Sequence, residues 1–238
     1  AQEKGFNLAS QKIGLVGAGN IGSRLAQRLT SFGCKVLISD PLLHPAKQQE
    51  LTNLGIKFAS LKEVINSTDI LSLHTPVTKD GQHPKLNVIA EEGLAALAGK
   101  VLVNTSRGEV INQAALLAAV NQPKPPLLIL DVFANEPAIN LEVVNACWLA
   151  TPHIAGYSLD GKLQGSWQVF SSWCKFVGIQ PQQELASFLP ASHLTGLSLS
   201  ASLSPQEACY LAASSCYQPL VDMHRFVNQL KSTELKSN

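Results

Sequence analysis

Residues 17–22 read Gly-Ala-Gly-Asn-Ile-Gly, and this stretch decides the fold of the chain. It matches the pattern GxGxxG, follows an apolar run at residues 12–16 and opens a stretch with helical periodicity. In that setting Gly17 permits a tight strand-to-helix turn, Gly19 leaves room for a pyrophosphate, and Gly22 lets helix and strand pack closely. The free N–H groups at the start of the helix attract phosphate. We expect the cofactor-binding residues of this turn to be Gly17, Gly19, Asn20, Ile21 and Gly22.

An acidic residue follows at the distance typical of NAD-binding domains. Asp40 lies eighteen positions after Gly22, at the end of the apolar run 35–39. A carboxylate there accepts hydrogen bonds from the ribose hydroxyls of NAD and repels the 2′-phosphate of NADP. The alternative is a glycine turn with an Asp that caps a helix before Pro41. The order of strand, glycines, helix and acid favours NAD.

Apolar runs without polar alternation recur along most of the chain, separated by helical patterns. Strands buried on both faces of a parallel sheet have this composition. We therefore predict an α/β fold, a doubly wound parallel sheet of the Rossmann type with right-handed crossovers. The expected strands are residues 12–16, 35–39, 56–59, 70–74, 101–105, 127–132 and 148–152.

The pattern changes after Gly178, which is placed to end a long helix. Residues 179–205 are rich in Gln, Pro, Ser and Leu and predict a linker with one short strand, followed by a helix from about residue 206. We expect a polar, disordered tail at 231–238. The predicted organisation is a remnant of an inter-domain connection (1–11), a Rossmann domain (12–178), and a linker with a partial α+β appendage (179–238).

Composition excludes several functions. The formal net charge is +1, only 15% of the residues are charged against roughly 25% in an average globular domain, and no basic stripe is present. Nothing therefore indicates nucleic acid or a membrane as a partner, and no apolar run approaches the ~20 residues of a membrane span. The five cysteines are scattered without CxxC spacing, which favours reduced thiols in a cytoplasmic protein and no metal site.

Three polar residues follow predicted strands, where open α/β sheets bind their ligands. Arg107 follows residues 101–105, Glu136 follows 127–132, and His153 follows the last strand. Each has a structural alternative: a surface Arg in a turn, a Glu beside a Pro-bounded loop, and a buried His with satisfied hydrogen bonds.

Together the three residues suit the oxidation of a 2-hydroxyacid. A His with a near-neutral pKa is a natural general base for the hydroxyl proton. A carboxylate on its other ring nitrogen fixes the tautomer, and an Arg binds the substrate carboxylate with two hydrogen bonds. The predicted catalytic residues are Arg107, Glu136 and His153.

The motifs, taken in order, resemble the D-isomer-specific 2-hydroxyacid dehydrogenases. They are GxGxxG, Asp, His-Thr-Pro, Asn-Thr-Ser-Arg-Gly, Asp-Val-Phe-x-x-Glu-Pro and Pro-His-Ile-Ala-Gly, spread over residues 12–178. The resemblance implies NAD as cofactor and the same catalytic roles for the Arg, Glu and His. It also implies that Thr75 and Asp131 contact NAD.

Two stretches, residues 74–84 and 153–162, resemble one branch of that family, which oxidises 4-phospho-D-erythronate to the 2-oxo acid in pyridoxal phosphate biosynthesis. Most relatives have a shorter loop after His-Thr-Pro. The resemblance implies that Gly156 lies at the cofactor and that Tyr157 contacts the substrate, although an ordinary packed aromatic is the alternative for Tyr157. The other candidate functions are a dehydrogenase for 3-phosphoglycerate or for glyoxylate and hydroxypyruvate, and a non-catalytic NAD-sensing module.

The family has an N-terminal substrate-binding half of about a hundred residues, whereas only eleven residues precede the first predicted strand. We therefore expect a truncated chain that binds NAD but turns over poorly by itself. Residues 197–226 faintly resemble a small dimerisation domain, which implies a homodimer when the protein is intact. The expected partner is otherwise a small phosphorylated 2-hydroxyacid.

Overall fold

The computed structural model describes residues 8–191 and 194–237, so residues 1–7 of the expected inter-domain remnant lie outside the described part. The described chain folds as two compact units. One runs to Pro152 and resumes at Gln218, and the other spans His153–Tyr217. These units divide the chain differently from the predicted domains, whose boundaries stay a prediction.

The first unit is built on a seven-stranded, all-parallel sheet with strand order β3-β2-β1-β4-β5-β6-β7. The predicted doubly wound fold is confirmed, and each strand lies within two residues of its predicted position. The reason is local, because these runs are apolar on both faces and can be buried only inside a layered α/β structure. The strands are β1 (Lys12–Val16), β2 (Lys35–Ser39), β3 (Lys57–Phe58), β4 (Ile70–Leu73), β5 (Val101–Asn104), β6 (Leu127–Leu130) and β7 (Cys147–Ala150).

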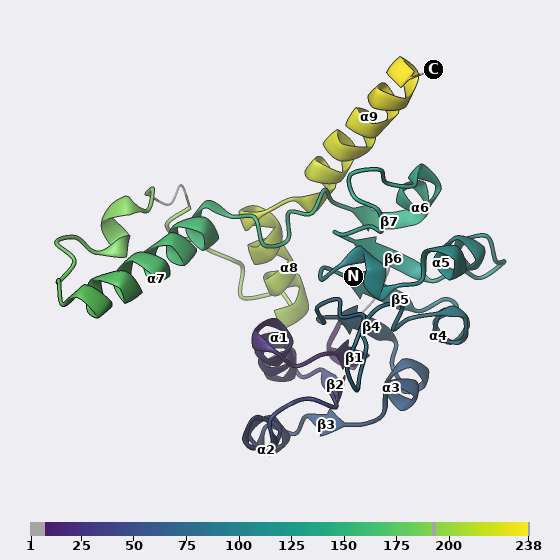
Figure 1. The fold of residues 1–238 in the computed structure, drawn as a ribbon, viewed down its shortest axis with the longest axis horizontal. Coiled ribbons are helices and arrows are strands. Elements are labelled where there is room, and N and C mark those ends of the chain that lie inside the picture. Colours follow the sequence, from purple (N-terminus) through teal and green to yellow (C-terminus); the bar gives the residue numbers. More distant parts are fainter. Residues whose placement is uncertain (1–7, 192–193, 238) are drawn as a thin grey trace. The chain divides into compact units, whose positions relative to one another are not determined.

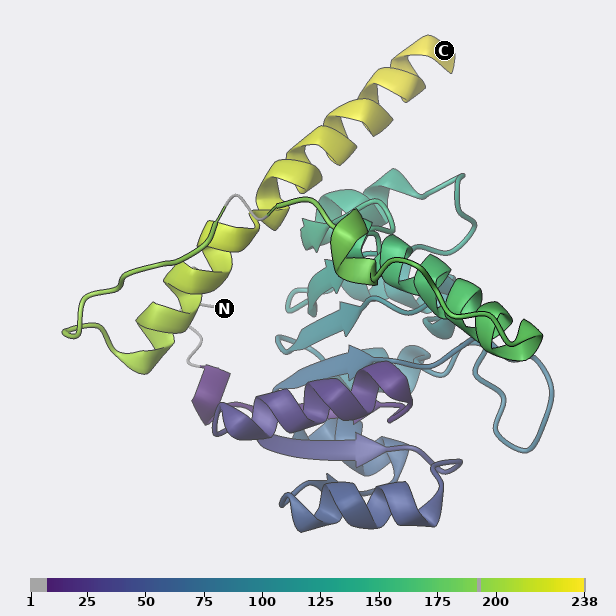
Figure 2. The same ribbon diagram turned by 90° about the vertical axis from the view of Figure 1, so that its left-hand side faces the viewer.

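Helices cover both faces of this sheet (Figures 1 and 2). One face carries α1 (Asn20–Ser31) and α2 (Pro45–Asn53). The other carries α3 (Leu61–Ser67), α4 (Glu91–Ala96), α5 (Gln113–Val120) and α6 (Leu141–Ala146). The chain changes faces between β1 and β4, which are neighbours in the sheet. In open α/β sheets this switch point forms a crevice at the carboxyl edge of the strands, where ligands bind.

The strands end level at that edge. Val16 of β1 pairs with Leu73 of β4, and Leu73 pairs with Asn104 of β5. The residues that follow these strands therefore emerge side by side. Below the edge the sheet separates two apolar cores, one under α1 and α2 around Leu15 and Ile38, the other under α3 to α6.

The last helix, α9 (Pro219–Ser237), packs against β7 and α6 of the first unit. Its Phe226 is buried, and the Phe226 and Phe133 ring centroids lie 5.9 Å apart. The prediction of a disordered tail is wrong for residues 231–237, because they continue α9 after its first half is anchored on the sheet.

The second unit is helical in its described part. Its long helix is α7 (Leu159–Val177). The N-cap is Ser158, whose Oγ accepts a hydrogen bond from the Gly161 N–H, and the C-cap is Gly178 with φ 76°. A 3₁₀ turn, η4 (Leu185–Phe188), and helix α8 (Pro205–Cys216) follow.

The predicted strand of the α+β appendage is absent from the described residues after Ala150. An extended segment becomes a strand only when a second segment pairs with it, whereas the backbone N–H groups of Ile179, Ser187 and Leu203 donate to carbonyl oxygens three to five residues earlier in the chain. The helices of the appendage are present, in α8 and α9.

Two short 3₁₀ turns complete the first unit, η2 (Leu8–Ser10) and η3 (Gly108–Val110). Among the described residues no helix is both long enough and apolar enough to cross a membrane. All five cysteines fall within the described residues, and all are free thiols.

Candidate active site

The glycine turn after β1 has the geometry that its motif requires. Gly17 has φ 95°, and a Cβ there would lie 2.6 Å from the carbonyl oxygen of His74. A Cβ at Gly22 would lie 2.1 Å from the carbonyl oxygen of Gly17. Real Cβ atoms do not approach backbone oxygens so closely, so both positions require glycine.

Gly19 differs from these two glycines because it faces open space. No atom lies within 4 Å of a Cβ built on it. It is the N-cap of α1, and no side chain caps that helix end. The next residue, Asn20, is exposed, and Ile21 is 65% exposed. An uncapped helix N-terminus beside an open glycine fits a pyrophosphate.

Asp40 holds the end of β2 against this turn and also faces a cavity. Its Oδ2 accepts a hydrogen bond from the Ala18 N–H at 2.8 Å, and its Oδ1 accepts one from the Leu42 N–H at 3.1 Å. The alternative in which Asp40 caps a helix is wrong, because α2 begins at Pro45 with His44 as its N-cap and no side chain caps α1. Asp40 also lines a cavity of about 660 Å³, the Asp40 pocket, which extends to Ser60 and Lys85. Each carboxylate oxygen has a second lone pair, so both can still accept ribose hydroxyls.

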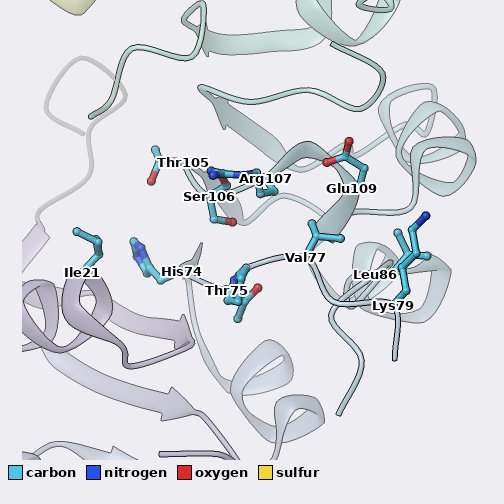
Figure 3. A pocket seen from close by; sticks show the side chains of 11 residues that line it. Ile21, His74, Thr75, Val77, Lys79, Leu86, Thr105, Ser106, Arg107 and Glu109 are labelled. Carbon is cyan, nitrogen blue, oxygen red and sulfur yellow. The ribbon is translucent and has the colours of Figure 1, made fainter. Parts of the chain in front are cut away.

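A second cavity of about 860 Å³, the Arg107 pocket, lies between the ends of β4 and β5 (Figure 3). Thr75 lines it, and its Oγ1 is buried without a hydrogen-bond partner in the part of the chain that the structure describes. A buried hydroxyl left unpaired costs free energy, so this atom fits a ligand that supplies the missing bond. The pocket is lined by Ile21, His74, Thr75, Pro76, Val77, Lys79, Leu86, Thr105, Ser106, Arg107 and Glu109.

The loop that carries Arg107 is held by Asn104, which ends β5 and is fully buried. The Asn104 Oδ1 accepts hydrogen bonds from the N–H and the Oγ of Ser106, at 3.0 and 2.9 Å. Its Nδ2 donates to the Arg107 carbonyl oxygen at 2.9 Å. The amide thus folds the loop back on the strand end, which leaves the exposed Arg107 guanidinium at the pocket.

Gly108 joins this loop to the loop of Glu136. A Cβ on Gly108 would lie 2.0 Å from the carbonyl carbon of Phe133 and 2.1 Å from its oxygen. The Phe133 N–H in turn donates to the Glu136 Oε1 at 2.8 Å. Arg107 and Glu136 follow the adjacent strands β5 and β6. The close contact between Gly108 and the Phe133 backbone fixes the relative position of their loops.

Asp131 follows β6 at the same edge. It is 3% exposed, and its Oδ1 accepts a hydrogen bond from the Thr151 hydroxyl at 2.5 Å. This bond ties the end of β6 to the segment after β7.

His153 and the predicted substrate residues belong to the second unit. His153 is the first residue of that unit and has φ 57°, a left-handed conformation that is uncommon for a residue other than glycine. Gly156 has open space around it. Tyr157 is 67% exposed, and the Lys162 Nζ lies 3.5 Å from the centre of its ring. Lys162 lowers the pKa of Tyr157, first by a hydrogen bond and then by its charge. The assembly of His153 with Arg107 and Glu136 stays a prediction.

His74 lies against the glycine turn and lines the Arg107 pocket. Its Nε2 forms a hydrogen bond with the Ser72 Oγ at 2.9 Å. Burial lowers the pKa of His74, so the ring is neutral at pH 7.

Several residues at this edge escaped the sequence prediction as site residues, namely His74, Lys79, Asn104 and Gly108. Asn104 had a usable signal, because an Asn at a strand end often hydrogen-bonds to backbone two residues onward. No group of three or more His, Cys, Asp or Glu side chains placed to hold a metal occurs in the described part of the chain.

The sheet order, the glycine turn and the acid after β2 together define a dinucleotide-binding domain of the Rossmann class. Comparison with known families names it more closely. The model of the D-isomer specific 2-hydroxyacid dehydrogenase, NAD binding domain, matches residues 1–155, and the chain belongs to this family.

Curated relatives are 37–42% identical to the chain over the aligned residues. Erythronate-4-phosphate dehydrogenase of Proteus mirabilis is 42% identical over 205 residues, which cover 85% of this chain and 53% of that protein. The enzyme of the same name from Stutzerimonas stutzeri is 37% identical over 235 residues, or 98% of this chain and 60% of its own length. The chain thus spans somewhat more than half the length of these relatives.

Solved structures resemble about three-quarters of the chain. D-lactate dehydrogenase from Aquifex aeolicus, crystallised with NAD and lactic acid, is 29% identical with a TM-score of 0.62, over 73% of this chain and 55% of that chain. A glyoxylate reductase from Paecilomyes thermophila is 27% identical with a TM-score of 0.63, over 73% of this chain and 51% of that chain.

Proposed function

We propose that the protein oxidises 4-phospho-D-erythronate to 3-hydroxy-2-oxo-4-phosphooxybutanoate with NAD, in pyridoxal phosphate biosynthesis. The observation that carries this proposal is the 37–42% identity to erythronate-4-phosphate dehydrogenases, over most of this chain. The long loop after β4 and the residues after His153 support this branch of the family over those acting on 3-phosphoglycerate or glyoxylate.

In the proposed reaction Arg107 binds the C1 carboxylate of the substrate with two hydrogen bonds and orients C2. His153 takes the proton of the C2 hydroxyl, and Glu136 stabilises the resulting imidazolium. NAD, when bound, supplies the acceptor for the hydride from C2. The products are the 2-oxo acid, NADH and the proton held by His153, so atoms and electrons balance.

The cofactor is assigned to the carboxyl edge of the sheet. The open space at Gly19 and the uncapped start of α1 suit the pyrophosphate, and Asp40 suits the adenosine ribose. The unpaired Thr75 hydroxyl supports a contact with NAD. We assign Asp131 and Gly156 to the cofactor and Tyr157 to the substrate on the resemblance to the family alone.

We further propose that the protein works as a homodimer in the cytoplasm. In this proposal residues 12–178 form the NAD-binding domain, and residues 179–238 contribute part of the dimerisation segment. Light scattering on the full-length gene product after gel filtration measures its mass; a monomeric mass would contradict the dimer.

The proposed activity is tested by NADH formation with the full-length gene product. We expect kcat/KM for 4-phospho-D-erythronate to exceed that for 3-phospho-D-glycerate by roughly a hundredfold or more, which corresponds to about 2.7 kcal/mol. His153→Asn should lower kcat by about 10²–10⁴-fold and leave NADH binding nearly unchanged. Preference for the glycerate would refute the substrate assignment but leave the family assignment intact.

A further inference from the structure

The Arg107 pocket contains charges that the protein does not neutralise. Arg107, Lys79 and Glu109 all line it. The Arg107 Nη1 donates to the Ser106 carbonyl oxygen. Within the described residues, however, none of the three side chains forms an ion pair. Two cations and one carboxylate leave the pocket with a net positive charge, which favours an anionic ligand.

Lys79 is held at this pocket by the fold of its own loop. The N–H groups of Lys85 and Leu86 both donate to the Thr78 carbonyl oxygen, at 2.8 and 3.1 Å. The Lys85 N–H also donates to the Thr78 Oγ1. These bonds close residues 79–84 into a loop whose first residue is Lys79. Figure 3 shows Lys79 beside Leu86 on one side of the pocket, whereas Ile21 and His74 lie on the opposite side of Arg107.

The two cations differ in what they bind best. A guanidinium is a planar fork that matches a carboxylate, as proposed for Arg107. A lysine ammonium is a flexible point charge with three donors, which suits a phosphate. A pocket with both cations is therefore suited to a small molecule with a carboxylate at one end and a phosphate at the other. The volume of about 860 Å³ leaves room for such a molecule beside a nicotinamide ring.

We propose that Lys79 binds the phosphate group of the substrate and thereby selects a phosphorylated 2-hydroxyacid. The proposal rests on the proposed function, because it assigns one anionic group of that substrate to a residue of the NAD-binding domain. Glu109, on the same pocket, opposes the binding of a dianion and weakens the interaction.

The test compares two substrates on the full-length gene product, namely 4-phospho-D-erythronate and D-erythronate, which lacks the phosphate. Lys79→Met should raise KM for the phosphorylated acid by roughly tenfold to a hundredfold. Its effect on KM for D-erythronate should stay below about twofold. Lys79→Arg should restore most of the loss, and Glu109→Gln should lower KM for the phosphorylated acid by a few-fold.

Lys35→Met is the matched control, because this exposed lysine begins β2 at the opposite edge of the sheet. It should leave both KM values unchanged. Equal effects of Lys79→Met on both acids would overturn the proposal, as would a rise confined to KM for NAD, which would assign Lys79 to the cofactor pyrophosphate. If the unaltered enzyme oxidises neither acid, the proposed function fails instead, so the two failures are distinguishable.

Discussion

The Asp40 pocket and the Arg107 pocket lie at the same edge of one sheet, but they are built differently. In the Asp40 pocket the functional carboxylate already accepts hydrogen bonds from the Ala18 and Leu42 N–H groups. Among the described residues, the charged groups of the Arg107 pocket have no ionic partner, and the buried Thr75 hydroxyl has no hydrogen-bond partner. The fold therefore fixes the carboxylate of the Asp40 pocket, whereas the charged side chains and the Thr75 hydroxyl of the Arg107 pocket are left to interact with a ligand.

This difference indicates separate roles for the two pockets. A group fixed by backbone hydrogen bonds presents constant geometry and suits the part of a ligand that does not change, here the adenosine ribose. Unpaired charges suit the reacting molecule, which must be bound, altered and released. We therefore expect substitutions in the Arg107 pocket to affect turnover, and substitutions in the Asp40 pocket to affect the choice between NAD and NADP.

The largest effect should come from the Arg107 pocket. Arg107→Gln removes the proposed carboxylate fork and should lower kcat/KM of the full-length gene product by about 10²–10³-fold. The NADH dissociation constant of the chain should change by less than about threefold. Arg28→Gln, in the last turn of α1, is the control and should leave both quantities unchanged. Loss of NADH binding in Arg107→Gln would contradict separate roles for the pockets.

The contact between the Arg107 and Glu136 loops should be the next most sensitive feature. Gly108→Ala forces a Cβ against the Phe133 carbonyl and should lower the free energy of unfolding by about 3 kcal/mol. Gly93→Ala, in α4, meets only ordinary contacts at 3.5 Å and should stabilise by up to about 1 kcal/mol. Urea unfolding of the two variants measures the difference; equal stabilities would show that the loops are not locked together.

A smaller effect is expected in the Asp40 pocket. Asp40→Asn removes the negative charge and keeps one oxygen, so it retains one of the two backbone hydrogen bonds that the carboxylate accepts. The preference for NADH over NADPH, measured by fluorescence titration of the chain, should fall by about tenfold. Asp69→Asn is the control, since its Oδ2 accepts from the Lys12 N–H at the opposite edge. An unchanged preference in Asp40→Asn would move the ribose contact to another residue.

The smallest effect concerns pH. Burial lowers the pKa of His74 in the folded state. As the pH falls, His74 is therefore protonated at a higher pH in the unfolded chain than in the folded chain. The stability from neutral His74 is therefore present above about pH 6.5 and is lost as the pH falls through the lower folded-state pKa. The free energy of unfolding should therefore decrease less from about pH 7.5 to about pH 5.5 in His74→Gln than in the unaltered chain. An equal decrease in the free energy of unfolding in both proteins would show that His74 does not cause this pH dependence.

The parts of the fold that follow local rules could be predicted from the sequence. The strands are apolar runs buried on both faces, and the glycine turn has one backbone geometry, so both were predicted correctly. The position of Asp40 directly after β2 was predicted correctly, and the structure adds that its carboxylate supports the glycine turn. Its contact with the ribose stays a prediction. These features depend on residues close together in the chain.

The parts that depend on distant contacts could not be predicted. The burial of Phe226 against Phe133 gives α9 its place on the first unit, and no local pattern in a polar segment indicates that packing. Lys79 lines the Arg107 pocket from a loop that the hydrogen bonds of Lys85 and Leu86 to Thr78 close. Gly108 is required because of the Phe133 backbone, which lies 25 residues further along the chain.

The most direct test of separate roles for the two pockets is a crystal structure of the 238-residue chain with NADH. We expect the ribose hydroxyls on the Asp40 carboxylate, the pyrophosphate over Gly19, and no cofactor phosphate on Lys79 or Arg107. A pyrophosphate bound by Lys79 and Arg107, with the Asp40 pocket empty, would contradict this expectation.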